Sequence, residues 1–76
     1  MKKLQPDVDG MNHRRARWAK TALQEFMAQT GVDCEDALSD LLADLMHLCD
    51  RESFDFEAAL DRARQHYAAE IGAAPY

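Results

Sequence analysis

Hydrophobic residues recur at helical spacing in three segments of this chain. In the middle segment, residues 33–50, apolar side chains fill an arc of roughly 180° when successive residues are placed about 100° apart. An ordinary surface helix needs an apolar stripe of only about 100°. The pattern therefore predicts a central helix that contacts two neighbours, or one neighbour and a second subunit. The arc consists of Ala37, Leu48, Leu41, Cys34, Leu45, Leu38, Cys49, Leu42 and Met46.

Capping residues set the expected ends of the first two helices. The first should span about residues 12–30, with Asn12 as its N-terminal cap and Gly31 in left-handed geometry at its end. Asp33 should cap the central helix, which is expected to end within residues 50–52. These signals place a short loop between the two helices.

The third helix should begin at Phe56, capped by Asp55 or Ser53, and end at Gly72. No segment alternates apolar and polar residues between turn signals, as a strand would. The pattern predicts an all-α fold, a compact three-helix bundle with short loops and antiparallel neighbours.

The expected domain covers residues 12–72. Residues 1–11 show no periodicity and contain Pro6 and Gly10, so we expect a flexible N-terminal tail, and residues 73–76 should form a C-terminal tail.

Length and composition limit the class of protein. A chain of 76 residues forms one domain and is marginally stable alone, which favours dense packing or a partner. Its 47% hydrophobic and 30% charged residues are typical of a folded protein. No apolar run approaches the roughly 20 residues of a membrane span, and the start of the chain lacks the apolar core of a signal peptide. We expect a cytoplasmic protein without a membrane segment.

The two cysteines fit a reducing compartment. Cys34 and Cys49 lie roughly 22 Å apart along the central helix, whereas a disulfide needs Cα atoms within about 7 Å. Both fall on the apolar arc, so we expect buried, reduced thiols.

Acidic residues cluster on the polar face of the central helix. Three carboxylates and an imidazole on adjacent turns suit a divalent cation. No second helix supplies further ligands, however, and such acids are commonly solvated or paired with arginines nearby. We therefore predict no bound metal and no other cofactor. The candidate ligands are Asp36, Asp40, Asp44 and His47.

Charge divides the chain unevenly around its net value of −5. Residues 1–20 carry six basic and two acidic side chains, whereas residues 21–76 carry three basic and twelve acidic ones. The segment HRRARWAK could pair with acids of the other helices, bind an acidic protein, or contact nucleic acid. The acidic remainder repels nucleic acid, which disfavours the last option. The candidate partner-binding residues are Arg14, Arg17, Trp18 and Lys20.

Catalytic motifs are missing from the sequence. There are two serines, no glycine-rich phosphate loop and no zinc-like cysteine spacing. We identify no catalytic residue and predict that the protein is not an enzyme.

Three stretches are distinctive in combination: NHRRARWA, DLLADLMHLCDRE and DFEAALDRARQHYAAE. Their layout resembles a group of small uncharacterised helical proteins encoded on plasmids and integrated mobile elements of proteobacteria. The resemblance covers about residues 12–70. It implies a cytoplasmic accessory protein of a mobile element, and it carries no activity.

A second stretch, ALSDLLADLMHLCDRESFDFEAALDRARQHY, is similar to the second half of MazG-type all-α nucleotide pyrophosphatases. Those enzymes bind magnesium through a Glu-x-x-Asp motif and an acidic pair on an earlier helix. Asp40 matches the Asp of that motif, but Ala37 stands at the Glu position and the first helix offers only Glu25. The resemblance therefore implies shared helix packing more than shared chemistry.

Together these observations favour a small cytoplasmic helical protein-interaction module, an accessory protein of a mobile element. Its partner would be a protein, or a second copy bound through the central helix. The alternatives are a magnesium-dependent nucleotide pyrophosphatase-like protein, a nucleic-acid-binding accessory protein, and an inhibitor of host defence that mimics nucleic-acid charge.

Overall fold

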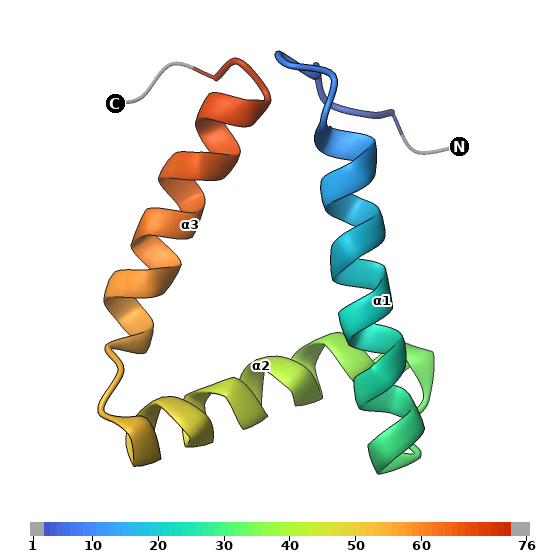
Figure 1. Ribbon diagram of the computed structural model, residues 1–76, viewed down its shortest axis with the longest axis vertical. Coiled ribbons are helices and arrows are strands. Elements are labelled where there is room, and N and C mark those ends of the chain that lie inside the picture. The colour runs from blue at the N-terminus through green and yellow to red at the C-terminus, as the bar shows by residue number, and fades with distance from the viewer. Residues whose placement is uncertain (1–2, 74–76) are drawn as a thin grey trace.

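The computed structural model describes residues 3–73, which form three α-helices joined by short loops (Figure 1). Helix α1 spans Asn12–Thr30, α2 spans Cys34–Glu52 and α3 spans Phe56–Glu70. These bounds agree with the hydrophobic spacing, and the prediction of an all-α, three-helix fold is confirmed. Of the expected C-terminal tail, residues 74–76 lie outside the described part of the chain.

The start of α1 differs from the prediction. Met11, and not Asn12, occupies the N-cap position, and Asn12 is the first helical residue. The backbone N–H of Asn12 donates to the Asp7 carboxylate at 3.2 Å, and the N–H of Met11 donates to Asp9 Oδ1 at 3.1 Å. Two acids of the preceding segment thus accept hydrogen bonds from two backbone N–H groups at the start of the helix and complement its dipole. The Asn12 side chain is left for another contact.

The remaining helix ends follow the predicted residues. Gly31 adopts a φ of 75° and its N–H donates to the Met27 carbonyl at 2.8 Å. Asp33 and Asp55 are the N-caps of α2 and α3, and Asp55 Oδ1 accepts from the Ala58 N–H at 3.0 Å. Ser53 ends α2 with a φ of 59°, a conformation in which a side chain costs energy.

The helices lie along the sides of an open triangle (Figure 1). Helix α2 contacts α1 near one end and α3 near the other, while α1 and α3 stay apart over most of their length (Figure 1). The radius of gyration is 14.4 Å, whereas about 11 Å is typical of a compact chain of this length. The arrangement is therefore more open than the compact packing expected from the short loops.

The hydrophobic core is correspondingly small. Among the described residues, Ala37 on α2 is the one fully buried hydrophobic residue. Leu23 and Phe26 of α1 and Leu41 of α2 are half-buried. The prediction of buried thiols is wrong for Cys34, which is exposed, while Cys49 is half-buried, and both are free. The reason is that only part of the apolar arc of α2 is covered by a neighbouring helix.

Candidate functional site: a polar clasp and an open apolar face

A cluster of charged and polar residues joins the segment before α1 to the end of α3. We call Asp9, Asn12, Arg15 and Glu70 the clasp. The Arg15 guanidinium donates from Nη1 and Nη2 to the two carboxylate oxygens of Asp9 at 2.9 and 2.8 Å. Its Nε lies 3.2 Å from Glu70 Oε2. Arg15 therefore links two carboxylates that are 61 positions apart in the sequence.

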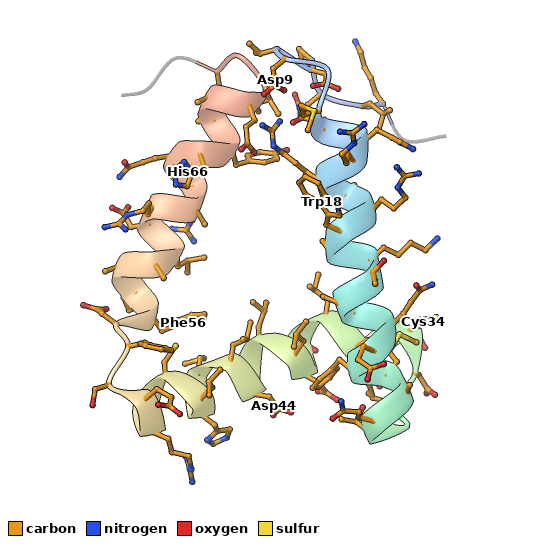
Figure 2. The ribbon with its side chains drawn as sticks, viewed as in Figure 1. Asp9, Trp18, Cys34, Asp44, Phe56 and His66 are labelled. Atoms are coloured by element: carbon orange, nitrogen blue, oxygen red, sulfur yellow. The ribbon has the colours of Figure 1, made fainter. Side chains whose placement is uncertain are left out.

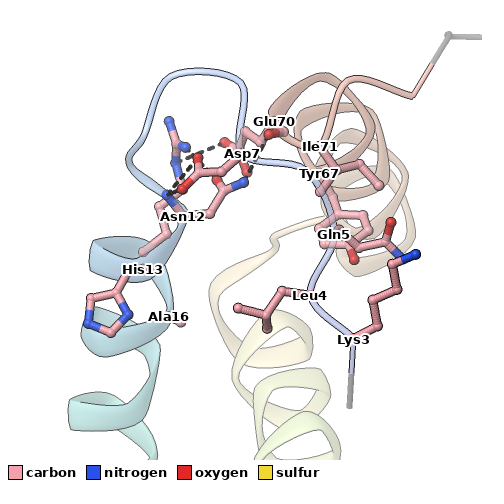
Figure 3. Close-up of a pocket in the computed structure, with 11 residues that line it drawn as sticks. Lys3, Leu4, Gln5, Asp7, Asn12, His13, Ala16, Tyr67, Glu70 and Ile71 are labelled. Atoms are coloured by element: carbon pink, nitrogen blue, oxygen red, sulfur yellow. Dashed lines mark hydrogen bonds and ion pairs between the residues drawn. The ribbon is translucent and has the colours of Figure 1, made fainter. Parts of the chain in front are cut away.

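Asn12 completes the connection between α1 and α3. Its Nδ2 donates to the Glu70 carbonyl at 2.9 Å, and its Oδ1 accepts from Arg15 Nη1 at 2.7 Å. The Val8 N–H donates to the same Glu70 carbonyl at 3.2 Å. Figure 3 shows Asn12 and Asp7 beside Glu70, where the chain before α1 passes the end of α3. Residues 7–12 thus close the apex of the triangle, which the expectation of a tail did not include.

The Asp9–Arg15 pair of the clasp is ionised at neutral pH. The pKa of Asp9 falls from 3.8 to about 2, chiefly because Arg15 donates hydrogen bonds to the carboxylate and secondly because the Met11 N–H does so. The hydrogen bond with Asp9 correspondingly raises the pKa of Arg15. Both side chains remain accessible to water, with 31% of the Arg15 side chain and 49% of that of Asp9 exposed. The clasp therefore orients α1 and α3 more than it stabilises a core.

An open cavity of about 790 Å³ lies between the N-terminal segment, α1 and α3. Apolar atoms of Leu4, Ala16, Tyr67 and Ile71 line it, with Asp7 and His13 at its polar side (Figure 3). A lining of this kind suits the apolar side chain of a partner.

The larger feature is an exposed apolar surface on α2, which we call the α2 face. Its side chains are 38–62% exposed, although all belong to the arc that the sequence assigned to contacts. Figure 2 shows Asp44 on the side of α2 that points away from the opening, with Phe56 and Trp18 beside the opening. Trp18 and Tyr67 add exposed aromatic surface on α1 and α3. The α2 face consists of Leu38, Leu42, Leu45, Met46 and Leu48.

The predicted basic residues of α1 lie on the surface. Arg14, Arg17 and Lys20 are exposed and make no ion pair within residues 3–73, and Trp18 is 60% exposed. The sequence also allowed these basic residues to pair with acids of another helix. Such a pair forms at Arg15, which contacts Glu70 of α3. Sequence reasoning missed Arg15 as a site residue. The available signal was its position, because it lies within the apolar stripe of α1, one turn before Ala19.

The acidic residues of α2 form an exposed stripe. Asp36, Asp40, Asp44 and His47 are all accessible to water, and none pairs with a basic side chain in the described part of the chain. Within residues 3–73, no three His, Cys, Asp or Glu side chains gather closely enough to hold a metal ion. None of the described helices has both the length and the apolarity needed to cross a membrane.

Comparison of the chain with protein-family models, with curated proteins and with solved structures finds no match. The structure itself defines the class: an all-α protein of three helices in an open arrangement, with an exposed apolar face. Functional inference therefore depends on the chemistry of its own surfaces.

Proposed function

We propose that this chain is a small protein-interaction module, acting in the cytoplasm as an accessory protein of a mobile element. The exposure of the α2 face is the observation that carries the proposal. Burying one leucine side chain contributes about 1.5–3 kcal/mol, so five exposed apolar side chains on one helix are a strong driving force for association. Contiguous apolar patches on soluble proteins commonly mark interaction sites. The role in a mobile element is supported by the resemblance over residues 12–70.

The basic surface of α1 adds a second element of recognition. Arg14, Arg17 and Lys20 are free of ion pairs within residues 3–73, and Trp18 borders them. Arginine and tryptophan are enriched at binding hot spots, and cations accelerate encounter with an acidic surface. We infer that this surface selects an acidic protein, because the acids of α2 and α3 would repel nucleic acid.

The proposal is tested by capture from a lysate of the native host with the immobilised chain. Arg14→Ala combined with Arg17→Ala should abolish capture of a discrete protein. The control variant Asp40→Asn, which removes an acidic side chain from α2, should leave capture unchanged. Capture should weaken as salt rises, and nuclease treatment should leave the partner bound. Release by nuclease would replace the proposal with a nucleic-acid accessory role. Capture that survives the double substitution would exclude α1 as the recognition surface.

The alternative, a magnesium-dependent nucleotide pyrophosphatase, would require oxygen ligands for magnesium and would release pyrophosphate from nucleotides. Ala37, at the position of the ligand Glu, is fully buried and offers no oxygen ligand, while Asp40 is exposed. We expect no pyrophosphate when the chain is incubated with a panel of nucleoside triphosphates and magnesium. Turnover that disappears in Asp40→Asn would establish the enzyme and overturn the interaction proposal.

A further inference from the structure

We propose that a second copy of this chain covers the α2 face, so that the functional unit is a symmetric homodimer. This inference rests on the proposed function, since it names one occupant of the interaction surface. The basic residues of α1 would then remain available for a different partner. Three independent properties of the single chain support a second copy as the occupant.

The first is the amount of uncovered surface. A compact monomer of 8.6 kDa exposes about 4,700 Å², whereas this chain exposes 6711 Å². The excess is about 2,000 Å² per chain, or about 4,000 Å² for two chains. Interfaces of obligate homodimers bury about 2,000–5,000 Å² in total, and the excess for two chains lies within that range. A short peptide would cover much less of it.

The second is the shape of the chain. Its extents are 34 × 31 × 17 Å, so the molecule is thin in one direction, little more than a single layer of helices. Stable domains consist of two or three packed layers around a core. A second copy packed against the first along its shortest, 17 Å axis would supply the missing layer of helices. The radius of gyration of 14.4 Å is already close to the roughly 15 Å expected of a compact globule twice as long.

The third is the charge around the α2 face. Between Leu38 and Leu48 the apolar arc contains no charged residue, although Glu35 lies within the arc one turn before this stretch. The acidic stripe containing Asp36, Asp40 and Asp44 lies beside the arc. Figure 2 shows Asp44 directed away from the opening. A symmetric pair therefore buries apolar surface against apolar surface and keeps the carboxylates of both copies in water. An anionic membrane or a nucleic acid would instead be repelled by the same stripe.

A two-fold axis would place the α2 face of one chain against that of the other. The face extends from Leu38 to Leu48, about 15 Å along the helix. Leu45 lies near the middle of the apolar arc and is 38% exposed. In a self-complementary interface each substitution occurs twice, so a charge at Leu45 would be repeated on both chains.

Sedimentation equilibrium of the whole chain tests the proposal. Wild-type protein should sediment at about 17 kDa, twice the mass of the 8.6 kDa chain. Leu45→Asp should weaken the dimer by about 100-fold or more, and the matched outer-face variant Asp40→Asn should leave it unchanged. The wild-type melting temperature should also rise with concentration between about 1 and 100 μM, which tests the dimer even if Leu45→Asp fails to fold.

A strict monomer with a melting temperature independent of concentration would overturn the dimer. A hydrophobic dye, anilinonaphthalene sulfonate, then separates the two proposals. Dye binding by that monomer would show that the α2 face is open, so the interaction module would stand with another occupant. A monomer that binds no dye would have closed on itself, and the module would fail as well. A dimer that persists in folded Leu45→Asp would overturn the assignment of the interface to α2.

Discussion

At the residue scale, the clasp depends on two charges placed inside apolar stripes. Arg15 lies between Ala22 and Phe26 on the helical wheel of α1, and Glu70 lies within the stripe of α3. A charge at such a position needs a partner when the stripe faces another helix. The opposite signs of Arg15 and Glu70 therefore point to their pairing at 3.2 Å. The participation of Asp9 could not be foreseen, because no periodicity orients the segment before α1.

The clasp predicts a specific dependence of stability on acid. The pKa of Asp9 is about 2 in the folded protein, below its ordinary 3.8, so its contribution is present above about pH 4 and is lost as the pH falls towards 2. Melting temperatures of wild type and Asp9→Asn should differ above pH 4 and converge near pH 2. Arg14→Gln should retain the wild-type behaviour, whereas Arg15→Gln should behave like Asp9→Asn. A constant difference across this range would contradict the role of the Asp9–Arg15 pair.

At the element scale, the helices were predictable because their caps and periodicity are local signals. Gly31, Asp33 and Asp55 occupy the positions that the sequence assigned to them. Asn12 was misassigned because two acids earlier in the chain serve the N-terminus of α1, which leaves its side chain to bind Glu70. The residue of α2 that is buried near its contact with α1 was harder to predict from the sequence. Nine residues share the arc of α2, and periodicity alone does not reveal that Ala37, near the end of α2 that contacts α1, is the one that is fully buried (Figure 1).

The contact at Ala37 predicts a contrast between two alanines of the same helix. Ala37 is 0% exposed, whereas Ala43 is exposed. Ala37→Leu should lower the free energy of unfolding by about 1–3 kcal/mol, because the added carbons force α1 and α2 apart. Ala43→Leu should change it by less than about 0.5 kcal/mol. Urea unfolding of the two variants measures the difference, and equal effects would mean that α1 does not pack at Ala37.

At the scale of the whole molecule, the sequence did not reveal the openness of the triangle. Three-residue loops follow α1 and α2, and short loops are typical of antiparallel neighbours. The direction of each turn depends on backbone conformation, here a φ of 75° at Gly31 and 59° at Ser53. Hydrophobic spacing specifies which face of a helix is apolar, but not what covers that face. The wide arc of α2 was explained equally well by two neighbouring helices or by a second subunit.

Because α1 and α3 stay apart over most of their length, we expect the clasp to fix the angle between these two helices. Spin labels at Lys20→Cys on α1 and Arg64→Cys on α3, in a Cys34→Ser, Cys49→Ser background, would report on this angle through the distance between them, measured by double electron–electron resonance. Dilution with unlabelled chain would suppress distances between two copies. The full chain should give one narrow distribution, and removal of residues 1–10 should broaden it, because Val8 and Asp9 are lost and only the contacts of Asn12 and Arg15 with Glu70 still join α1 to α3 directly.

The matched control for this measurement is Lys3→Ala, since Lys3 belongs to the same segment but makes no hydrogen bond or ion pair within residues 3–73. Its distribution should match that of the full chain. The helix content by circular dichroism should persist in the truncated chain except at the first turn of α1, which loses Asp7 and Asp9, because α2 and α3 begin far outside the deleted segment. An unchanged narrow distribution after truncation would mean that contacts along α2 hold the triangle open without the clasp.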